Sequence, residues 1–94
     1  SVSAEKAEQM GMIYAVYAGA EFESKSLELA KSISEMPTKG LGYTKKLLNH
    51  SLNNTLVEQL DLEAETQALS AKSEDHKEGI QAFLEKRKPV FTGK

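Results

Sequence analysis

Apolar side chains recur along most of the chain at intervals of three and four residues, the spacing of an amphipathic helix. Helices are predicted at residues 3–11, 20–36, 38–50, 55–72 and 73–88. Residues 12–18 are rich in β-branched and aromatic side chains, so we predict a brief extended segment there. The pattern therefore predicts an all-α domain, a small bundle of four to five helices joined by short connections.

Several helix ends are predicted from capping residues. Ser3, Thr55 and Ser73 precede helices and can accept a hydrogen bond from a free backbone N–H. Glu58 stands three residues after Thr55, which completes a capping box. Gly11 can take the left-handed conformation that ends the first helix.

Two glycines lie inside the helix predicted after Pro37. Gly40 and Gly42 each cost this helix about 1 kcal/mol relative to alanine. Close packing against another backbone would explain them, because glycine has no side chain in the way. Asn53 and Asn54 then mark a turn.

Helix 55–72 has apolar positions on two sides. One side is formed by Val57, Leu60, Ala64, Ala68 and Ala71. Leu62 and Leu69 lie away from this stripe. Two interpretations stay open: the helix is buried within the bundle, or its second side meets another chain or domain.

The last predicted helix, 73–88, has acids near its start and bases near its end, which complements the helix dipole. These charged residues are Asp75, Glu78, Lys86, Arg87 and Lys88. Ile80, Phe83 and Leu84 are predicted to face the core. Pro89 ends the helix and leaves residues 90–94 as a tail.

The composition is that of one small domain, with 94 residues of which 39% are apolar and 28% charged. A chain of this length buries roughly 60% of its unfolded surface, enough for a modest core. The lack of cysteine excludes disulfides and thiolate metal sites, and the two histidines are far apart, so we expect no metal site. No apolar run approaches a membrane span and no signal peptide is recognisable, so we expect a cytoplasmic protein.

Charge is distributed unevenly along the chain. Residues 1–81 carry eight lysines and thirteen acidic residues, a net charge of −5. Residues 82–94 carry four basic residues against Glu85, a net charge of +3. The acidic body argues against nucleic-acid binding, which needs a broad positive face. The basic end permits a local contact with an anionic group such as a phosphate.

No grouping of catalytic side chains is recognisable. The glycines of KGLGY lack the surrounding residues of a phosphate-binding loop. Glu63 and Glu65 point to different faces of their helix, which argues against shared acid–base work. His76 is expected to be solvated in the first turn of its helix. From its residues alone, the chain is a helical binding or assembly module.

The segment EGIQAFLEKRKPVFTGK, residues 78–94, resembles the C-terminal end of the enoyl-CoA hydratase/isomerase (crotonase) superfamily. The pattern E-G-x-x-A-F-x-E-K-R-x-P-x-F is typical there. It is matched by Glu78, Gly79, Ala82, Phe83, Glu85, Lys86, Arg87, Pro89 and Phe91. Residues 3–17, 27–49 and 60–79 resemble preceding segments of the same family. Residues 36–63 and 86–94 are most similar to the phenylacetate-pathway isomerases of ring-epoxidised phenylacetyl-CoA.

The resemblance implies a part of an enzyme rather than a whole one. Members of the family are much longer, and their N-terminal part carries the oxyanion-hole N–H groups and the acids that hydrate or isomerise acyl-CoA thioesters through a stabilised enolate. Residues 1–94 are therefore expected to form the C-terminal helical domain, without catalytic residues and inactive alone. No covalently bound cofactor is implied, since the CoA thioester carries the substrate.

The resemblance also implies binding roles. In this family the C-terminal helices form trimers or hexamers and cover the CoA site, often that of a neighbouring subunit. Phe83 would contact the adenine and Lys86 the phosphates of CoA. A second aromatic of some members is replaced here by Gln67, so the adenine pocket would be incomplete.

Other interpretations stay open. Phe83 can be a core residue, and Lys86 with Arg87 a helix-end charge cluster. The whole chain can be a free-standing helical module that binds an acyl-CoA or another protein, or a dimerisation domain indifferent to CoA.

Overall fold

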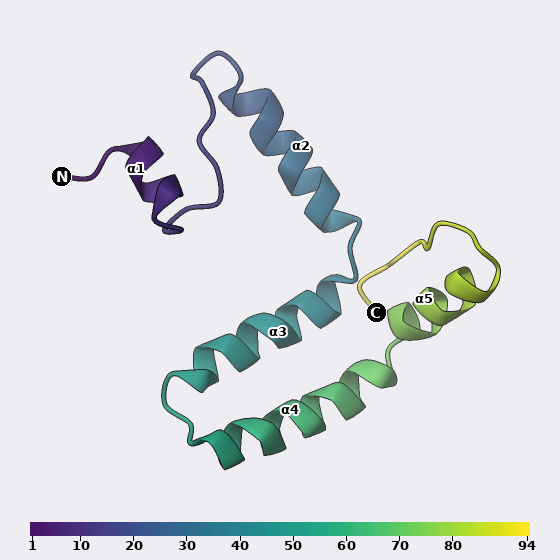
Figure 1. Ribbon diagram of the computed structural model, residues 1–94. Helices are drawn as coiled ribbons and strands as arrows, with labels where there is room; N and C mark the ends of the chain where they lie inside the picture. The colour runs from purple at the N-terminus through teal and green to yellow at the C-terminus, as the bar shows by residue number, and fades with distance from the viewer. The chain divides into compact units, whose positions relative to one another are not determined.

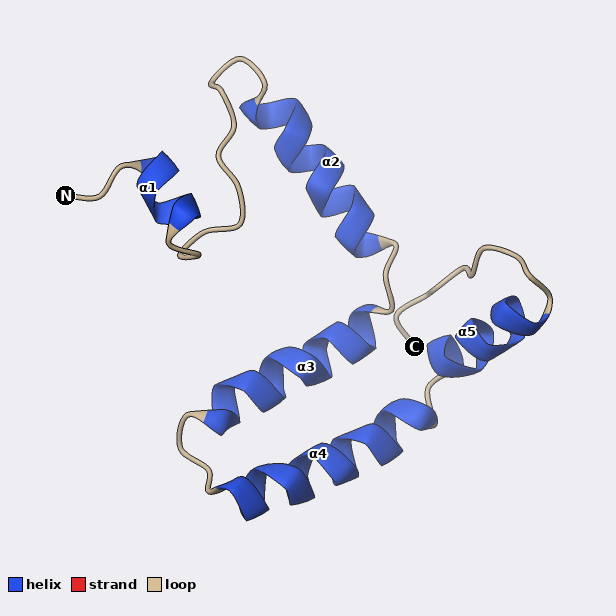
Figure 2. Cartoon of the chain, viewed as in Figure 1, coloured by secondary structure: helices blue, strands red, loops and turns tan.

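The structure, a computed structural model, describes all residues from 1 to 94, and every regular element in it is a helix (Figure 2). The helices are α1 (Ala4–Gln9), α2 (Phe22–Ser34), α3 (Thr38–Ser51), α4 (Leu56–Ala71) and α5 (Glu74–Leu84) (Figure 1). The all-α prediction is confirmed. Residues 12–18 form a bend and an irregular segment rather than a strand, because no other extended segment pairs with them.

The chain divides into two compact units, residues 1–31 and 32–94. In the first unit, the Ser3 hydroxyl accepts the N–H of Lys6 at the start of α1. Gly11 ends α1 with φ +72°, as predicted. An irregular segment then leads to α2, which begins two residues later than predicted, at Phe22.

In the second unit, α3 and α4 form an antiparallel hairpin (Figure 1). The chain turns at Asn53 and Asn54, and α4 begins with the predicted capping box. The Thr55 hydroxyl accepts the N–H of Glu58 at 3.2 Å, and the Glu58 carboxylate accepts the N–H of Thr55 at 2.8 Å. These contacts join residues only three positions apart, which explains why the start of α4 could be predicted from the sequence.

The explanation offered for the α3 glycines is wrong in this chain. A Cβ built at Gly40 or Gly42 would meet no atom within 4 Å outside its own helix. No backbone therefore packs against either glycine.

The apolar stripe of α4 is exposed rather than buried. Val57 is 67% exposed and Leu60 55% exposed. The side of α4 that packs in this unit is the one formed by Gln59, Leu62, Thr66 and Ser70. Burial of the stripe within the bundle is therefore wrong for this chain.

Most of the buried residues in this chain are polar. Ala82, 1% exposed, is the single buried apolar residue, whereas Thr66, Ser73 and Asp75 are the buried polar ones. The modest hydrophobic core expected from chain length is therefore absent, and large apolar side chains lie open along every helix after α1. None of the helices is both long and apolar enough to cross a bilayer.

Candidate functional site

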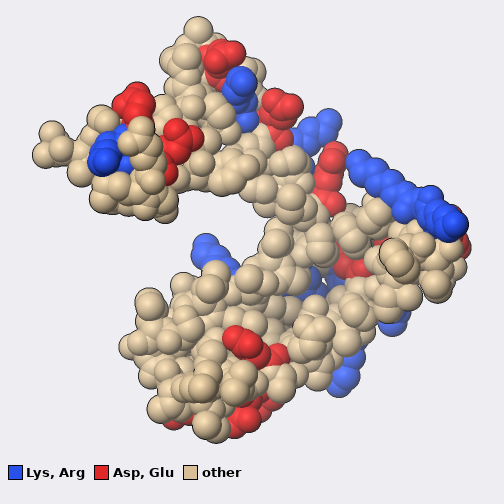
Figure 3. Space-filling model, viewed as in Figure 1, with Lys and Arg blue, Asp and Glu red and all other residues tan.

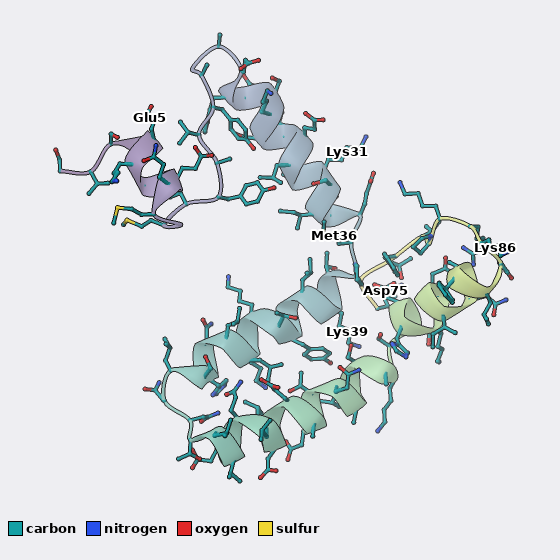
Figure 4. All side chains as sticks on the ribbon, viewed as in Figure 1. Glu5, Lys31, Met36, Lys39, Asp75 and Lys86 are labelled. Atoms are coloured by element: carbon teal, nitrogen blue, oxygen red, sulfur yellow. The ribbon has the colours of Figure 1, made fainter.

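The residues after α5 fold back along that helix instead of forming a free tail, so that the chain ends near the start of α5 (Figure 1). Asp75, in the first turn of α5, binds this returning segment, residues 85–94, which we call the return (Figure 4). Its Oδ1 accepts the N–H of Thr92 at 2.7 Å and its Oδ2 accepts the N–H of Gly93 at 2.8 Å. The N–H of Asp75 donates to the carbonyl of Lys94 at 3.0 Å. A carboxylate only 3% exposed is thus fully hydrogen-bonded.

Two glycines lie at contacts of the return. The ring of Phe91 lies over Gly79, with its Cε1 3.6 Å from the place of a Cβ. Gly93 has φ +77°, and a Cβ there would stand 2.8 Å from Thr38 Oγ1. Gly93 therefore needs both the left-handed backbone and the missing side chain.

Ion pairs close the other end of the return. Arg87 binds Glu78 through two N–H···O contacts of 2.6 and 2.9 Å, and Glu85 through a third of 2.5 Å. Glu78 also accepts the N–H of Val90 at 2.8 Å. We call Glu78, Glu85 and Arg87 the clasp.

The hydrogen bonds of the clasp shift the pKa values of its three residues. Hydrogen bonds from Arg87, then from the Val90 N–H, lower the pKa of Glu78 from 4.5 to about 2. Gln81 and then Arg87 lower the pKa of Glu85. The two carboxylates in turn raise the pKa of Arg87. All three groups are therefore charged at neutral pH.

The predicted extension of the last helix to residue 88 is wrong. α5 ends at Leu84, and Lys86 has φ +55°, the one positive φ outside glycine. The N–H of Lys86 donates to the Phe83 carbonyl and that of Arg87 to the Ala82 carbonyl. This is a Schellman motif, which turns the chain before the basic residues can join the last turn.

The predicted core face of α5 is also wrong. Ile80 and Leu84 are exposed, and Phe83 is 82% exposed. The covered face of α5 is the one that contacts the return. Its residues, which are less exposed than the rest of the helix, are Asp75, Glu78, Gly79 and Ala82. The core interpretation of Phe83 is thereby excluded in this chain.

Phe83 is one of the residues that line an open pocket of about 410 Å³ beside α5. The other lining residues come from the start of α3, the end of α4, α5 and the return: Pro37, Gly40, Ser70, Ser73, Asp75, His76, Gly79, Ile80 and Phe91. His76 is exposed, as predicted. Gln67 lies in a smaller pocket between α3 and α4 instead. No three His, Asp or Glu side chains come together in a group that could hold a metal ion.

Lys86 lies outside this pocket, at the far end of α5 (Figure 4). Lysine and arginine side chains form a band over the loop after α5 (Figure 3). Lys86 and Phe83 are both exposed and are linked through their backbone, since the Lys86 N–H donates to the Phe83 carbonyl at 3.2 Å. The structure brings the two predicted site residues to one end of α5.

Sequence reasoning missed the roles of Asp75, Glu78 and Arg87. Asp75 and Glu78 were assigned to the helix dipole, yet they bind the return. The spacing of Glu78, Arg87 and Pro89 within one pattern of charges and turn residues was the available signal. It did not show which acid pairs with Arg87, because that pairing depends on the turn at Lys86.

Comparison with known proteins gives the same family along the whole chain. Residues 1–94 match the Enoyl-CoA hydratase/isomerase family. The chain is 44% identical to 1,2-epoxyphenylacetyl-CoA isomerase of Escherichia coli over 99% of its length, and 33% identical to 2,3-dehydroadipyl-CoA hydratase of the same organism over 100%. It covers 36% and 37% of those proteins.

A solved structure agrees with the sequence comparison. The enoyl-CoA hydratase subunit I of Geobacillus kaustophilus superposes with a TM-score of 0.89 at 37% identity, over 98% of this chain and 36% of that one. The backbone of the five helices is therefore similar to that of a solved enoyl-CoA hydratase. The chain belongs to the enoyl-CoA hydratase/isomerase family.

Proposed function

We propose that residues 1–94 are the C-terminal helical domain of an enzyme that hydrates or isomerises acyl-CoA thioesters. Family membership over the whole chain supports this, as does its span of about a third of its relatives' length. The observation that carries the proposal is the lack of a hydrophobic core, with Ala82 the single buried apolar residue. Helices with open apolar faces are built to be covered by more protein.

In this proposal the chain covers the CoA part of the substrate. Phe83 offers an exposed aromatic ring that can contact adenine, and Lys86 offers an exposed ammonium group for a phosphate. The open helical faces contribute contacts to the rest of the subunit and to neighbouring subunits of a trimer or hexamer. The substrate first to be tested is 1,2-epoxyphenylacetyl-CoA, because the relative acting on it shares 44% identity.

The chemistry would be done outside these residues. Enolate stabilisation needs backbone N–H donors aimed at the thioester oxygen, together with a positioned acid or base. We assign no residue of this chain to either role. The purified 94-residue chain is expected to show no turnover of crotonyl-CoA or 1,2-epoxyphenylacetyl-CoA. Measurable turnover by the chain alone would contradict the proposal.

The binding role is tested in the full-length enzyme. Phe83→Ala and Lys86→Ala should each raise KM for the acyl-CoA about fivefold, with kcat unchanged, because they remove contacts present in ground and transition states alike. Lys88→Ala is the matched control, an exposed lysine of the same loop. An unchanged KM in both variants, or an equal rise in Lys88→Ala, would exclude the assigned CoA contact.

A free-standing acyl-CoA-binding or protein-interaction module is the second candidate, which the open faces disfavour. Light scattering and a CoA titration of the chain alone separate the two. Self-association with weak CoA binding supports the domain, whereas a monomer that binds CoA tightly supports the free-standing module.

A further inference from the structure

We propose that Arg87 is a positioning residue for Lys86: the clasp fixes the backbone on both sides of Lys86 and so aims its ammonium group at the CoA phosphates. This inference rests on the proposed contact between Lys86 and CoA. It adds a role for residues that do not touch the ligand.

The first observation is the backbone of Lys86. A helix that ends in a Schellman motif has a left-handed residue just after its cap, a place normally filled by glycine. α1 ends in this way at Gly11, with φ +72°. α5 ends in the same way at Lys86, with φ +55°. A side chain in this conformation is strained, so the surroundings must hold it there.

The second observation is what holds it. Glu85 and Arg87 flank Lys86 and bind each other across it at 2.5 Å. Arg87 is then anchored to Glu78 by a bidentate contact, and Glu78 accepts the N–H of Val90 beyond the turn. The planar guanidinium fork fixes direction as well as distance. Lys86 therefore sits in a turn closed on both sides.

The third observation is how charge is divided in the loop. The guanidinium of Arg87 already faces two carboxylates, so it is neutralised within the chain. Lys86 and Lys88 form no ion pair. An incoming phosphate would thus bind the ammonium group of Lys86, while Arg87 stays paired with the carboxylates and fixes the backbone of Lys86.

The test is a double-mutant cycle in the full-length enzyme, read as KM for an acyl-CoA and for the matching acyl-pantetheine, which lacks the nucleotide and its phosphates. Arg87→Ala should raise KM for the acyl-CoA about threefold and leave that for the acyl-pantetheine unchanged. In a Lys86→Ala background, Arg87→Ala should have no further effect on KM. A structural role alone would change both substrates and persist in both backgrounds.

Two further variants should raise KM for the acyl-CoA to different extents, and a third serves as a control. Arg87→Lys keeps the charge but loses the fork, so it should resemble Arg87→Ala. Glu85→Gln removes only the weaker link and should raise KM less. Lys77→Ala breaks the exposed pair with Glu74 on the same helix and should leave KM unchanged.

The outcomes separate the two proposals. If Lys86→Ala leaves KM for the acyl-CoA unchanged, the proposed CoA contact fails. If Lys86→Ala raises KM but Arg87→Ala does not, or if Arg87→Lys restores the wild-type KM, only the positioning role is overturned.

Discussion

The α3–α4 hairpin and the region from Ser73 to Lys94 are stabilised in opposite ways. The hairpin leaves large apolar side chains such as Leu60 open to solvent. The region after Ser73 buries a carboxylate, pairs three charged residues and places Gly93 where a side chain would be strained. The hairpin therefore leaves apolar surface uncovered in this chain, whereas the polar and charged groups of the end region find their partners within the region itself.

The difference also separates two kinds of sequence signal. Apolar residues at helical spacing show that a face will be covered, but not by what. Charged residues, glycine and proline at fixed spacing mark specific contacts. In this chain, the end region carries the second kind of signal and forms contacts between specific side chains and backbone groups.

Asp75→Ala should have the largest effect on the stability of the end region. It leaves the N–H groups of Thr92 and Gly93 without an acceptor, at a cost of about 3 kcal/mol. Chemical denaturation followed by circular dichroism measures this loss in the full-length enzyme. Asp61→Ala, which removes an exposed carboxylate from α4, is the matched control. Equal small losses in both variants would contradict the role of Asp75.

A pair of glycine substitutions should give opposite signs in the two regions. Gly93→Ala should destabilise by about 1–2 kcal/mol, because φ is +77° and the new Cβ meets Thr38. Gly42→Ala should stabilise the isolated chain by about 0.5–1 kcal/mol, because it lies inside a helix with open space beside it. Thermal unfolding of both variants measures these changes in stability. If both variants are stabilised, or both destabilised, the distinction between the two regions is lost.

Acid should loosen the clasp within a defined pH window. The pKa of Glu78 is about 2 in the folded chain and 4.5 ordinarily, so the unfolded state takes up the proton first as pH falls. The contribution of Glu78 is complete above about pH 4.5 and is lost between there and about pH 2. In Glu78→Gln the stability difference between pH 7 and pH 3 should shrink. An unchanged difference would show that other carboxylates govern acid unfolding.

The positions of the helices along the sequence were largely predictable, because caps and breakers act locally. Ser3, Thr55 and Ser73 begin their helices as predicted, and each accepts the expected N–H. The C-terminus of α5 was not predictable in this way. Three bases after an amphipathic stretch are typical of a last helical turn, whereas the chain turns earlier, at Lys86, and Arg87 then pairs with two acids.

The candidate site was predictable only through the family resemblance. Periodicity placed Phe83 in the core with Ile80, but the return binds the opposite face of α5. That choice depends on contacts between residues 17 and 18 positions apart, such as Asp75 with Thr92 and Gly93. Helical spacing carries no information about such pairs.

Lys86→Gly should have the smallest effect on stability and a favourable one. Relief of about 1–2 kcal/mol of left-handed strain exceeds the cost of about 0.5–1 kcal/mol for the freer unfolded glycine. A small rise in Tm should therefore accompany a raised KM for the acyl-CoA. A lower Tm would mean that the lysine side chain stabilises the turn by itself.

Amide hydrogen exchange, compared between the 94-residue chain and the full-length enzyme, tests the contrast between the two regions most directly. The amides of Thr92 and Gly93 should be protected in both, since their acceptor Asp75 lies within the chain. The amides of α3 and α4 should gain strong protection only in the full-length enzyme, where their apolar faces are covered. Equal protection of α3 and α4 in both proteins, or free exchange of Thr92 and Gly93 in the chain alone, would contradict this account.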